Sequence, residues 1–315
     1  MTTGSVPRIL VIKHGALGDV VQALGPLGAI RAHHPGARIT VLTAPLFASL
    51  FAAAPEVDEV WIDERPAFWR VGAWLALRRR LLGAGFERVY DLQTSRRSSL
   101  LFRLLGPGRR PEWSGIAPGC SHPHANPARD RMHTVLRQAE QLRHAGIAEV
   151  PAPDLSFLDA PLARYGLTVP FVLLVPGGSA ARPAKRWPIE RFAALAVALA
   201  RDRIQPVVLG TVPERSLAAT IQAACPATRD LVADTSFAEI TALARAAAGA
   251  VGNDTGPLHL IAAADCPAVV LFSAESDPAL CAPRGRDVRV LRRPHLEALG
   301  HEEVGAALAA ILRRS

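Results

Sequence analysis

The decapeptide VGNDTGPLHL, residues 251–260, places a carboxylate, a hydroxyl, a glycine and an imidazole just after a short apolar run. Thr255 suits the N-cap of a following helix, whose first N–H groups are unpaired and carry partial positive charge. The start of such a helix is a favourable place for a phosphate. The four candidates for binding an anionic ligand are Asp254, Thr255, Gly256 and His259. A capped turn with a packed histidine explains the same residues without any ligand.

A second anion-binding pattern is PGGSAARPAKRWP, residues 176–188, which follows another apolar run. Glycines after a strand let backbone N–H groups approach an anion, while Ser179 adds a hydroxyl and Lys185 adds a charge. Of the 36 basic residues only Lys13 and Lys185 are lysines, and all the others are arginines. A lysine supplies a compact, rotatable ammonium in place of a rigid guanidinium. This bias draws attention to the segments around the two lysines.

The segment HGALGD, residues 14–19, occupies the expected turn between the first strand and the first helix. Dinucleotide-binding folds carry Gly-x-Gly-x-x-Gly at this turn, but this chain has only Gly15 and Gly18. The second strand does not end in the Asp or Glu that would hold a ribose, so we expect no nicotinamide cofactor. Asp19 opens the helix, either as a favourable N-terminal carboxylate or as a general base. The local sequence supports both interpretations equally.

The segment CSHPH, residues 120–124, comes nearest to a metal-binding pattern. Its Cys-x-His-x-His spacing, with His133 downstream, offers three donors, but the second half of a closed zinc site is missing. The Asp-x-Asp of metal-dependent sugar transfer and the Gly-x-Ser-x-Gly of serine hydrolases are absent as well. We therefore expect neither a metal nor another cofactor.

Composition restricts the class of protein and its compartment. The chain has 315 residues, half of them hydrophobic and a fifth charged, as in soluble globular proteins. No apolar run reaches the roughly eighteen residues that a membrane span needs. The N-terminus enters a strand without the regions of a signal peptide. The four cysteines show no CxxC spacing, as expected for reduced thiols. These features predict a cytoplasmic protein.

The formal net charge of +8 favours anionic partners. Many arginines gather in the first half of the chain, at positions 78–80, 96–97, 103 and 109–110. A nucleic-acid surface would interleave aromatic residues with that charge or show a recognisable module, and the sequence does neither. We therefore expect no nucleic acid as a partner. The arginines form either a solvated face or a patch for an acidic lipid or glycan.

Strand-like and helix-like segments alternate along both halves of the chain. Apolar runs such as RILVIK (residues 8–13) and ARITVLT (37–43) alternate with helical patterns such as VVQALGPLGAIRAHH (20–34). A segment punctuated by prolines then precedes FVLLVP (171–176), where the alternation restarts. Repeated β–α units predict parallel sheets covered by helices on both faces.

The proline-punctuated segment divides the chain into an N-terminal domain of residues 1–150, a linker of residues 151–169 and a C-terminal domain of residues 170–315. Each domain is expected to be a doubly wound, Rossmann-like α/β unit. Ligands of such folds bind outside the carboxyl ends of the strands. Two such domains facing each other would border a cleft with those ends.

Three segments together resemble glycosyltransferase family 9, the ADP-heptose:lipopolysaccharide heptosyltransferase family. They are HGALGDVVQALGPLGAIRAHH from residue 14, KRWPIERFAALA from residue 185 and GNDTGPLHLIAAADCPAVVLF from residue 252. The resemblance extends over nearly the whole chain. It implies a GT-B fold, with two Rossmann-like doubly wound domains facing across a cleft. It also implies an inverting, metal-independent transfer of a sugar from a nucleotide donor.

The resemblance assigns roles to single residues. Asp19 matches the catalytic aspartate of the family's Gly-Asp motif, with Gly15 and Gly18 in the loop near acceptor and donor. The lysine before Trp-Pro neutralises the donor pyrophosphate in the family, and the Asp-Thr-Gly-x-x-His segment holds the donor sugar and its phosphates. The implied donor-binding residues are Ser179, Lys185, Glu214, Asp254, Thr255, Gly256 and His259.

The chain departs from the family pattern in two segments of its second half. ADTS, residues 233–236, stands where the family often has Gly-Lys-Thr-Ser. LFSAESDP, residues 271–278, replaces the commoner LFGPTDP. Loss of the family's glycine is expected to reshape the donor pocket, so the resemblance leaves the identity of the nucleotide sugar open.

The expected activity is transfer of a heptose, or a related sugar, from an ADP-sugar to a lipopolysaccharide core or another anionic glycan. The expected partners are therefore ADP-heptose and an anionic glycolipid or glycan, with a peripheral contact to the cytoplasmic face of the inner membrane left open. The alternatives are a GT-B enzyme for a UDP- or GDP-sugar, a nucleotide-sugar epimerase, or a catalytically silent nucleotide-sugar-binding protein. The presence of both Asp19 and Lys185 speaks against the silent protein.

Overall fold

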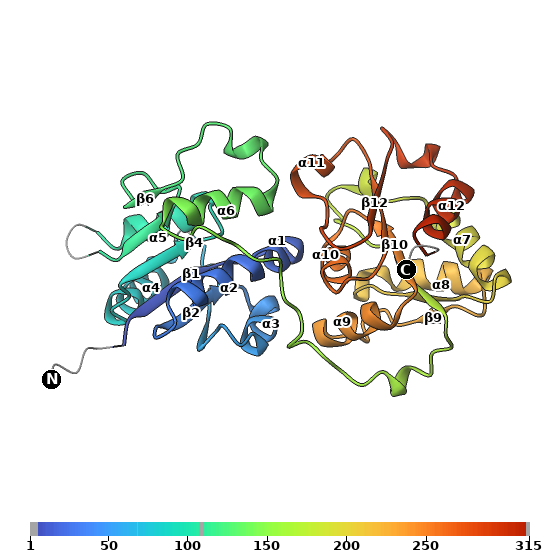
Figure 1. Ribbon diagram of the computed structural model, residues 1–315, viewed down its shortest axis with the longest axis horizontal. Coiled ribbons are helices and arrows are strands. Elements are labelled where there is room, and N and C mark those ends of the chain that lie inside the picture. Colours follow the sequence, from blue (N-terminus) through green and yellow to red (C-terminus); the bar gives the residue numbers. More distant parts are fainter. Residues whose placement is uncertain (1–5, 68, 107–109, 313–315) are drawn as a thin grey trace. The chain divides into compact units, whose positions relative to one another are not determined.

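The computed structural model describes residues 6–67, 69–106 and 110–312. The chain forms two compact units, Met1–Phe157 and Leu158–Ser315, which run from blue to green and from green to red in Figure 1. The boundary between them falls inside the segment 151–169. Each unit is an α/β domain with its own parallel sheet.

The first unit contains a six-stranded parallel sheet with the order β3-β2-β1-β4-β5-β6. Its strands are β1 (Arg8–Ile12), β2 (Arg38–Thr43), β3 (Glu59–Ile62), β4 (Arg88–Asp91), β5 (Glu112–Gly115) and β6 (His122–Pro123). Its α-helices are α1 (Leu17–Gln22), α2 (Leu24–His33), α3 (Ala48–Ala53), α4 (Val71–Gly83), α5 (Arg96–Leu104) and α6 (Thr134–His144). The central strand β1 pairs with β2 on one side and β4 on the other.

The core of the first unit explains why its strands are continuous apolar runs. Four of the five residues of β1 and five of the six residues of β2 are buried, as in parallel strands covered on both faces. On one face, Trp74 of α4 and Phe102 of α5 pack with Leu10 and Trp113 of the sheet. The rings of Phe102 and Trp113 meet edge to face, with centroids 5.3 Å apart.

The expected single helix over residues 20–34 is two helices, α1 and α2, which meet at Ala23. Pro26 explains the break. Proline has no N–H to donate to the carbonyl four residues earlier, which here belongs to Gln22, the last residue of α1. The prediction of one helix was therefore wrong at this point. The segment around Cys120 and His124 contains the short strand β6 and a 3-10 turn, Arg129–Arg131.

The second unit contains a six-stranded parallel sheet with the order β12-β11-β10-β7-β8-β9. Its strands are β7 (Phe171–Val175), β8 (Gln205–Val208), β9 (Arg229–Asp230), β10 (Gly249–Asn253), β11 (Ala268–Phe272) and β12 (Val288–Arg292). Its α-helices are α7 (Ile189–Arg201), α8 (Arg215–Ala224), α9 (Phe237–Ala246), α10 (Gly256–Ala263), α11 (Pro278–Cys281) and α12 (His301–Leu312). In each of the three strands β7, β10 and β11, all five residues are buried.

Both sheets have the same order of strands when each is counted from its own first strand. That order is the doubly wound one, in which the sequence of strands reverses beside the first strand. The reversal lies between β1 and β4 in the first unit and between β7 and β10 in the second. Loops that leave these four strands at their carboxyl ends are therefore the expected ligand-binding loops.

Across residues 6–67, 69–106 and 110–312, no helix is both long enough and apolar enough to cross a lipid bilayer.

Candidate active site

Asp19 lies in the first turn of α1, after the loop that leaves the central strand β1. Its Oδ2 accepts a hydrogen bond from the backbone N–H of Ala16 at 3.3 Å, so the carboxylate folds back over the loop. Gly15 adopts φ +132°, and a Cβ there would come within 2.7 Å of the Phe47 ring. The loop therefore requires this glycine, which sets the direction in which α1 starts. The other predicted loop glycine, Gly18, is buried in α1.

Lys13 directly follows β1 and Asp91 is the last residue of β4, so both lie at the carboxyl ends of two paired strands. Lys13 is 3% exposed, and its Nζ donates a hydrogen bond to the carbonyl of Leu92 at 3.1 Å. Burial lowers the pKa of Lys13, while the charges of Asp19 and Asp91 oppose that shift. Asp91 is completely buried, and burial raises its pKa to about 6. A lone Asp at a strand end carries no motif, so sequence patterns did not select it.

His14 anchors the loop after β1 to the segments that follow β4 and β3. Its backbone N–H donates to Oε1 of Gln93 at 2.8 Å, and its Nε2 lies 3.1 Å from Oδ2 of Asp63. Arg97 of α5 binds both oxygens of that carboxylate, through Nη2 at 2.8 Å and Nε at 3.1 Å. Burial would raise the pKa of Asp63, but the contacts with His14 and Arg97 hold it well below its usual range. Sequence patterns missed Asp63 because its partners are distant along the chain.

A cavity of about 610 Å³ opens beside the loop of residues 14–16. Three arginines contribute to its wall, namely Arg65, Arg96 and Arg97. The first unit as a whole is basic, because residues 1–157 contain 19 Arg and Lys against 13 Asp and Glu. This edge of the sheet therefore suits an anionic ligand next to the loop that leads to Asp19.

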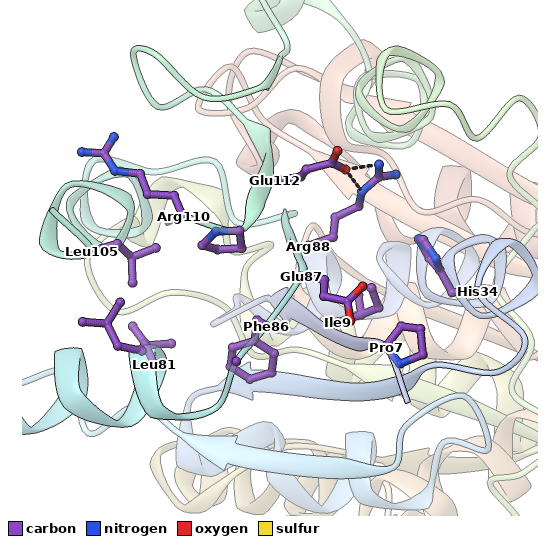
Figure 2. A pocket seen from close by; sticks show the side chains of 13 residues that line it. Pro7, Ile9, His34, Leu81, Phe86, Glu87, Arg88, Leu105, Arg110 and Glu112 are labelled. Carbon is purple, nitrogen blue, oxygen red and sulfur yellow. Dashed lines mark hydrogen bonds and ion pairs between the residues drawn. The ribbon is translucent and has the colours of Figure 1, made fainter. Parts of the chain in front are cut away.

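Another cavity of about 700 Å³ lies at the opposite, amino-terminal edge of the same sheet. Figure 2 shows its apolar lining, which includes Leu81, Phe86 and Leu105, and the ion pair between Arg88 and Glu112. None of the predicted site residues lines this cavity. Because ligands of doubly wound sheets bind at the carboxyl edge, we place the candidate active site at the other edge.

In the second unit, Asn253 joins the loops at the reversal point of the sheet. Its side chain is completely buried. Oδ1 accepts a hydrogen bond from the backbone N–H of Trp187 at 2.9 Å, and Nδ2 donates to the carbonyls of Pro176 at 2.8 Å and Gly177 at 3.2 Å. One side chain thus holds together the loop after β7, the segment after Lys185 and the end of β10. Its place just before the predicted Asp254 was the only sequence signal for it.

Lys185 and Asp254 are in contact at the carboxyl edge of the second sheet, although they are 69 positions apart in the sequence. Nζ of Lys185 lies 2.6 Å from Oδ2 of Asp254, and the two side chains are 12% and 7% exposed. Ser276 donates a hydrogen bond from Oγ to the same Oδ2 atom at 2.7 Å. Ser276 lies in the LFSAESDP segment after β11, and the sequence patterns did not select it. The three residues therefore lie in the segments that follow three adjacent strands, β7, β10 and β11.

Helix α10 begins directly after Asp254 in the sequence. Thr255 is its N-cap residue and Gly256 its first residue, as the sequence predicts. The Thr255 side chain makes no capping hydrogen bond to the helix, so its hydroxyl can serve a ligand. His259 lies one turn further on and is only 8% exposed.

Glu214 lies against the glycine loop after β7, whereas Ser179 of that loop is exposed. Oε2 of Glu214 accepts hydrogen bonds from the backbone N–H and the hydroxyl of Thr211 at 2.8 and 2.6 Å. A Cβ at Gly177 would come within 3.0 Å of the Glu214 Cγ, so the glycine makes room for this glutamate. Among the described residues, no hydrogen bond links the Ser179 side chain to Lys185 or Glu214.

The ADTS segment contains a left-handed residue at the position where the family pattern has glycine. Ala233 adopts φ +58°, in the left-handed region that glycine favours. Its N–H donates to the carbonyl of Gly210 at 2.8 Å, and the neighbouring Asp234 pairs with Arg164 at 3.0 Å. This chain therefore places an alanine, with its Cβ, in a left-handed conformation that glycine adopts more readily.

The residues of the 120–124 segment do not converge on one point. Sγ of Cys120 contacts the carbonyl of Gly115, whereas Nε2 of His124 lies 3.8 Å from a carboxylate oxygen of Glu140. Within the part of the chain that the structure describes, no group of three or more His, Cys, Asp or Glu side chains is arranged to hold a metal ion.

Known proteins share both the sequence pattern and the fold. A model of glycosyltransferase family 9 (heptosyltransferase) matches residues 74–304. The lipopolysaccharide heptosyltransferase 2 of Salmonella typhimurium is 26% identical over 314 residues, which cover 90% of this chain and 88% of that protein.

Two solved structures from Escherichia coli superpose on most of the chain. The ADP-heptose lipopolysaccharide heptosyltransferase II has a TM-score of 0.77 and 23% identity, covering 98% of this chain and 99% of its own. Heptosyltransferase WaaC with ADP has a TM-score of 0.75 and 21% identity, covering 96% and 99%. Together with the two parallel six-stranded sheets, these likenesses confirm the predicted GT-B fold. The family match confirms the predicted enzyme class: the chain belongs to glycosyltransferase family 9 and is a heptosyltransferase-like glycosyltransferase.

Proposed function

We propose that this glycosyltransferase moves a heptose from ADP-heptose to the core of lipopolysaccharide, with inversion at the anomeric carbon and without a metal ion. The observation that carries the proposal is the meeting of Lys185 with Asp254 beside the start of α10. A relative is named a lipopolysaccharide heptosyltransferase, and a structural neighbour was solved with ADP. The chemistry of such a donor suits the residues that this chain brings together.

The second unit has the groups that a departing nucleoside diphosphate needs. During transfer the bond between the anomeric carbon and the diphosphate oxygen breaks, and negative charge builds up on the diphosphate. The Lys185 ammonium, the Thr255 hydroxyl and the first N–H groups of α10 supply positive charge and hydrogen-bond donors for it. These groups take the role of a metal ion, and Gly256 lets the backbone approach the phosphates closely.

The remaining predicted donor residues extend this binding edge. We assign Glu214 to the ribose, because its carboxylate is oriented by Thr211 beside the glycine loop. Ser179 is assigned to a phosphate, because it is exposed in that loop. Asp254 is assigned to the donor sugar, since a carboxylate accepts hydrogen bonds from sugar hydroxyls. His259 is assigned to the donor sugar as well, because it belongs to the same Asp-Thr-Gly-x-x-His segment.

The first unit supplies the base. An acceptor hydroxyl attacks the anomeric carbon on the face opposite the diphosphate, which inverts the configuration, and its proton passes to the Asp19 carboxylate. Asp19 is partly exposed at the start of α1, and its hydrogen bond from Ala16 orients it. A general base placed in this way contributes about 10²- to 10⁴-fold to the rate.

The acceptor side of the proposal rests on charge. The cavity beside the loop of residues 14–16 has Arg65, Arg96 and Arg97 in its wall, and an anionic core glycan would be attracted to that edge. A lipopolysaccharide acceptor is attached to a membrane. We therefore propose that the protein acts in the cytoplasm, in peripheral contact with the cytoplasmic face of the inner membrane.

Calorimetric titration with ADP, UDP, GDP and CDP tests the donor assignment. We expect ADP to bind at least tenfold more tightly than the other three, a difference of about 1.4 kcal/mol. Preference for UDP or GDP would point to another nucleotide sugar. In a separate incubation of the protein with a nucleotide sugar and no acceptor, isomerisation of the sugar would point to an epimerase. Binding without any turnover would favour the silent protein.

A transfer assay with ADP-heptose and a core acceptor tests the reaction itself. We expect the activity to be the same with and without EDTA, and we expect the product linkage to have the opposite anomeric configuration to the donor. Loss of activity in EDTA that added zinc or magnesium restores would contradict the metal-independent mechanism.

A further inference from the structure

The ammonium that we assign to the donor diphosphate already has a partner within the protein. Nζ of Lys185 lies 2.6 Å from Oδ2 of Asp254, and both side chains are almost buried. Solvent screens a pair in such surroundings only weakly. A diphosphate that binds at Lys185 therefore meets a carboxylate that competes for the ammonium and repels the incoming negative charge.

The Asp254 carboxylate is also held in place. Its Oδ2 accepts a second hydrogen bond from Oγ of Ser276 at 2.7 Å, and its backbone N–H donates to the carbonyl of Leu271 at 3.0 Å. Ser276 thus gives the carboxylate a partner other than Lys185. When the Lys185 ammonium also donates a hydrogen bond to a phosphate, its contact with Oδ2 of Asp254 weakens. The hydrogen bond from Ser276 then still stabilises that oxygen.

We propose that Asp254 and Ser276 allow the second unit to discriminate between a nucleotide sugar and the bare nucleoside diphosphate. This inference rests on the proposed function. The sugar of a bound donor offers hydroxyls that donate to the Asp254 carboxylate and compensate for its weakened contact with Lys185. The nucleoside diphosphate left after transfer has no such hydroxyls and one more negative charge, so Asp254 opposes its binding.

The consequence concerns release of the product. Asp254 is a specificity-determining residue that weakens the complex with the nucleoside diphosphate once the sugar has left. Ser276 is a positioning residue, because it acts through the Asp254 carboxylate. Neither the family motifs nor the charge pattern marks Ser276, which lies in the segment where this chain departs from the family pattern.

The test titrates ADP and ADP-heptose into the wild-type protein and into Asp254→Asn. Asparagine keeps the size of the side chain and removes its charge. We expect ADP to bind about tenfold more tightly to the variant, which corresponds to about 1.4 kcal/mol. ADP-heptose should bind no more tightly than to the wild type, because the amide is a weaker acceptor for sugar hydroxyls. The preference for the donor over ADP should therefore fall by tenfold or more.

A double-mutant cycle with Ser276→Ala tests the positioning role. Without the hydroxyl, Asp254 depends on Lys185 alone, so we expect ADP to bind about threefold more weakly. In the Asp254→Asn background the same substitution should leave ADP binding unchanged, because no charged oxygen remains to be shared. Ser216→Ala, at an exposed serine of α8, is the matched control and should behave as the wild type.

The possible outcomes separate the two proposals. If Lys185→Ala weakens ADP binding but Asp254→Asn does not strengthen it, the discrimination by Asp254 is refuted while the donor site stands. An equal effect of Ser276→Ala in both backgrounds would refute the positioning role. If the wild type binds no ADP, the proposed function and this inference both fail. Should Asp254→Asn not fold, the Ser276→Ala titration still decides, since unchanged ADP binding contradicts the proposal.

Discussion

His14 and Asp63 form a buried contact at the carboxyl edge of the first sheet, with Nε2 of His14 3.1 Å from Oδ2 of Asp63. The two side chains are 3% and 1% exposed, and Arg97 binds the same carboxylate through both oxygens. This network connects the loop after β1 with the end of β3 and the start of α5. Because the loop after β1 leads directly into α1, the network braces the segment that orients Asp19.

We predict that Asp63→Asn destabilises the protein by about 3 kcal/mol, since removing one member of a buried ion pair leaves the other uncompensated. Where the variant still folds, kcat for transfer should fall while the Kd for ADP stays unchanged, because the second unit is intact. Denaturant unfolding and calorimetry measure the two effects. Glu303→Gln is the control, because it breaks the exposed pair with Arg293 and should cost less than about 1 kcal/mol.

The same carboxylate predicts a pH dependence of stability. The folded-state pKa of Asp63 lies below its unfolded value of about 3.9. Its contribution to stability is therefore fully present above about pH 4 and is lost as the pH falls toward the lowered folded-state pKa. Unfolding of the wild type and Asp63→Asn at several pH values should show the difference between them shrinking in acid. A constant difference from pH 7 to pH 2 would contradict the ionised network.

We predict that Asp19→Asn abolishes transfer without weakening the binding of ADP. Asparagine can still accept the hydrogen bond from Ala16, so α1 should start as before. Loss of the base should lower kcat at least about 100-fold. Glu149→Gln, at an exposed carboxylate of the same unit, should leave kcat unchanged. If Asp19→Asn keeps more than a tenth of the wild-type turnover, Asp19 is not the base.

We predict that Lys185→Ala weakens the binding of ADP far more than that of adenosine. A hydrogen bond from a charged group contributes about 1.5–3 kcal/mol, or roughly ten- to a hundredfold in affinity. The Asp254 carboxylate loses its ammonium partner in this variant, which adds to the repulsion of the diphosphate. Titration of both ligands into both proteins decides the matter. Equal losses for nucleoside and diphosphate would mean that Lys185 shapes the pocket without contacting phosphate.

We predict that Ala233→Gly stabilises the protein by about 1 kcal/mol, because a left-handed backbone costs a residue with a Cβ roughly that amount. Thermal and denaturant unfolding measure the gain. Ala128→Gly is the matched control: Ala128 has φ −88°, so glycine there should only increase the entropy lost on folding. A destabilised Ala233→Gly variant would show that the left-handed conformation carries no strain.

The sequence by itself determined the fold class and most of the candidate residues. Apolar runs that alternate with helical patterns are local features, and covered parallel strands require them. The helix start at Thr255 and Gly256 was equally local, since the preference of threonine for the N-cap position needs no distant partner, although its side chain makes no capping hydrogen bond here. The break at Ala23 was also within reach, because Pro26 removes a specific helical hydrogen bond.

Only the tertiary structure decided which of these residues act together. Asn253, Ser276 and Asp63 have no motif of their own, and each becomes significant through a partner that the strand order brings beside it. The same holds for Lys185. The sequence gives no partner for its ammonium, whereas in the fold the ammonium pairs with Asp254. The physical reason is that buried polar groups must find partners, and in a doubly wound sheet the partners come from strands that end at the same edge of the sheet but are distant along the chain.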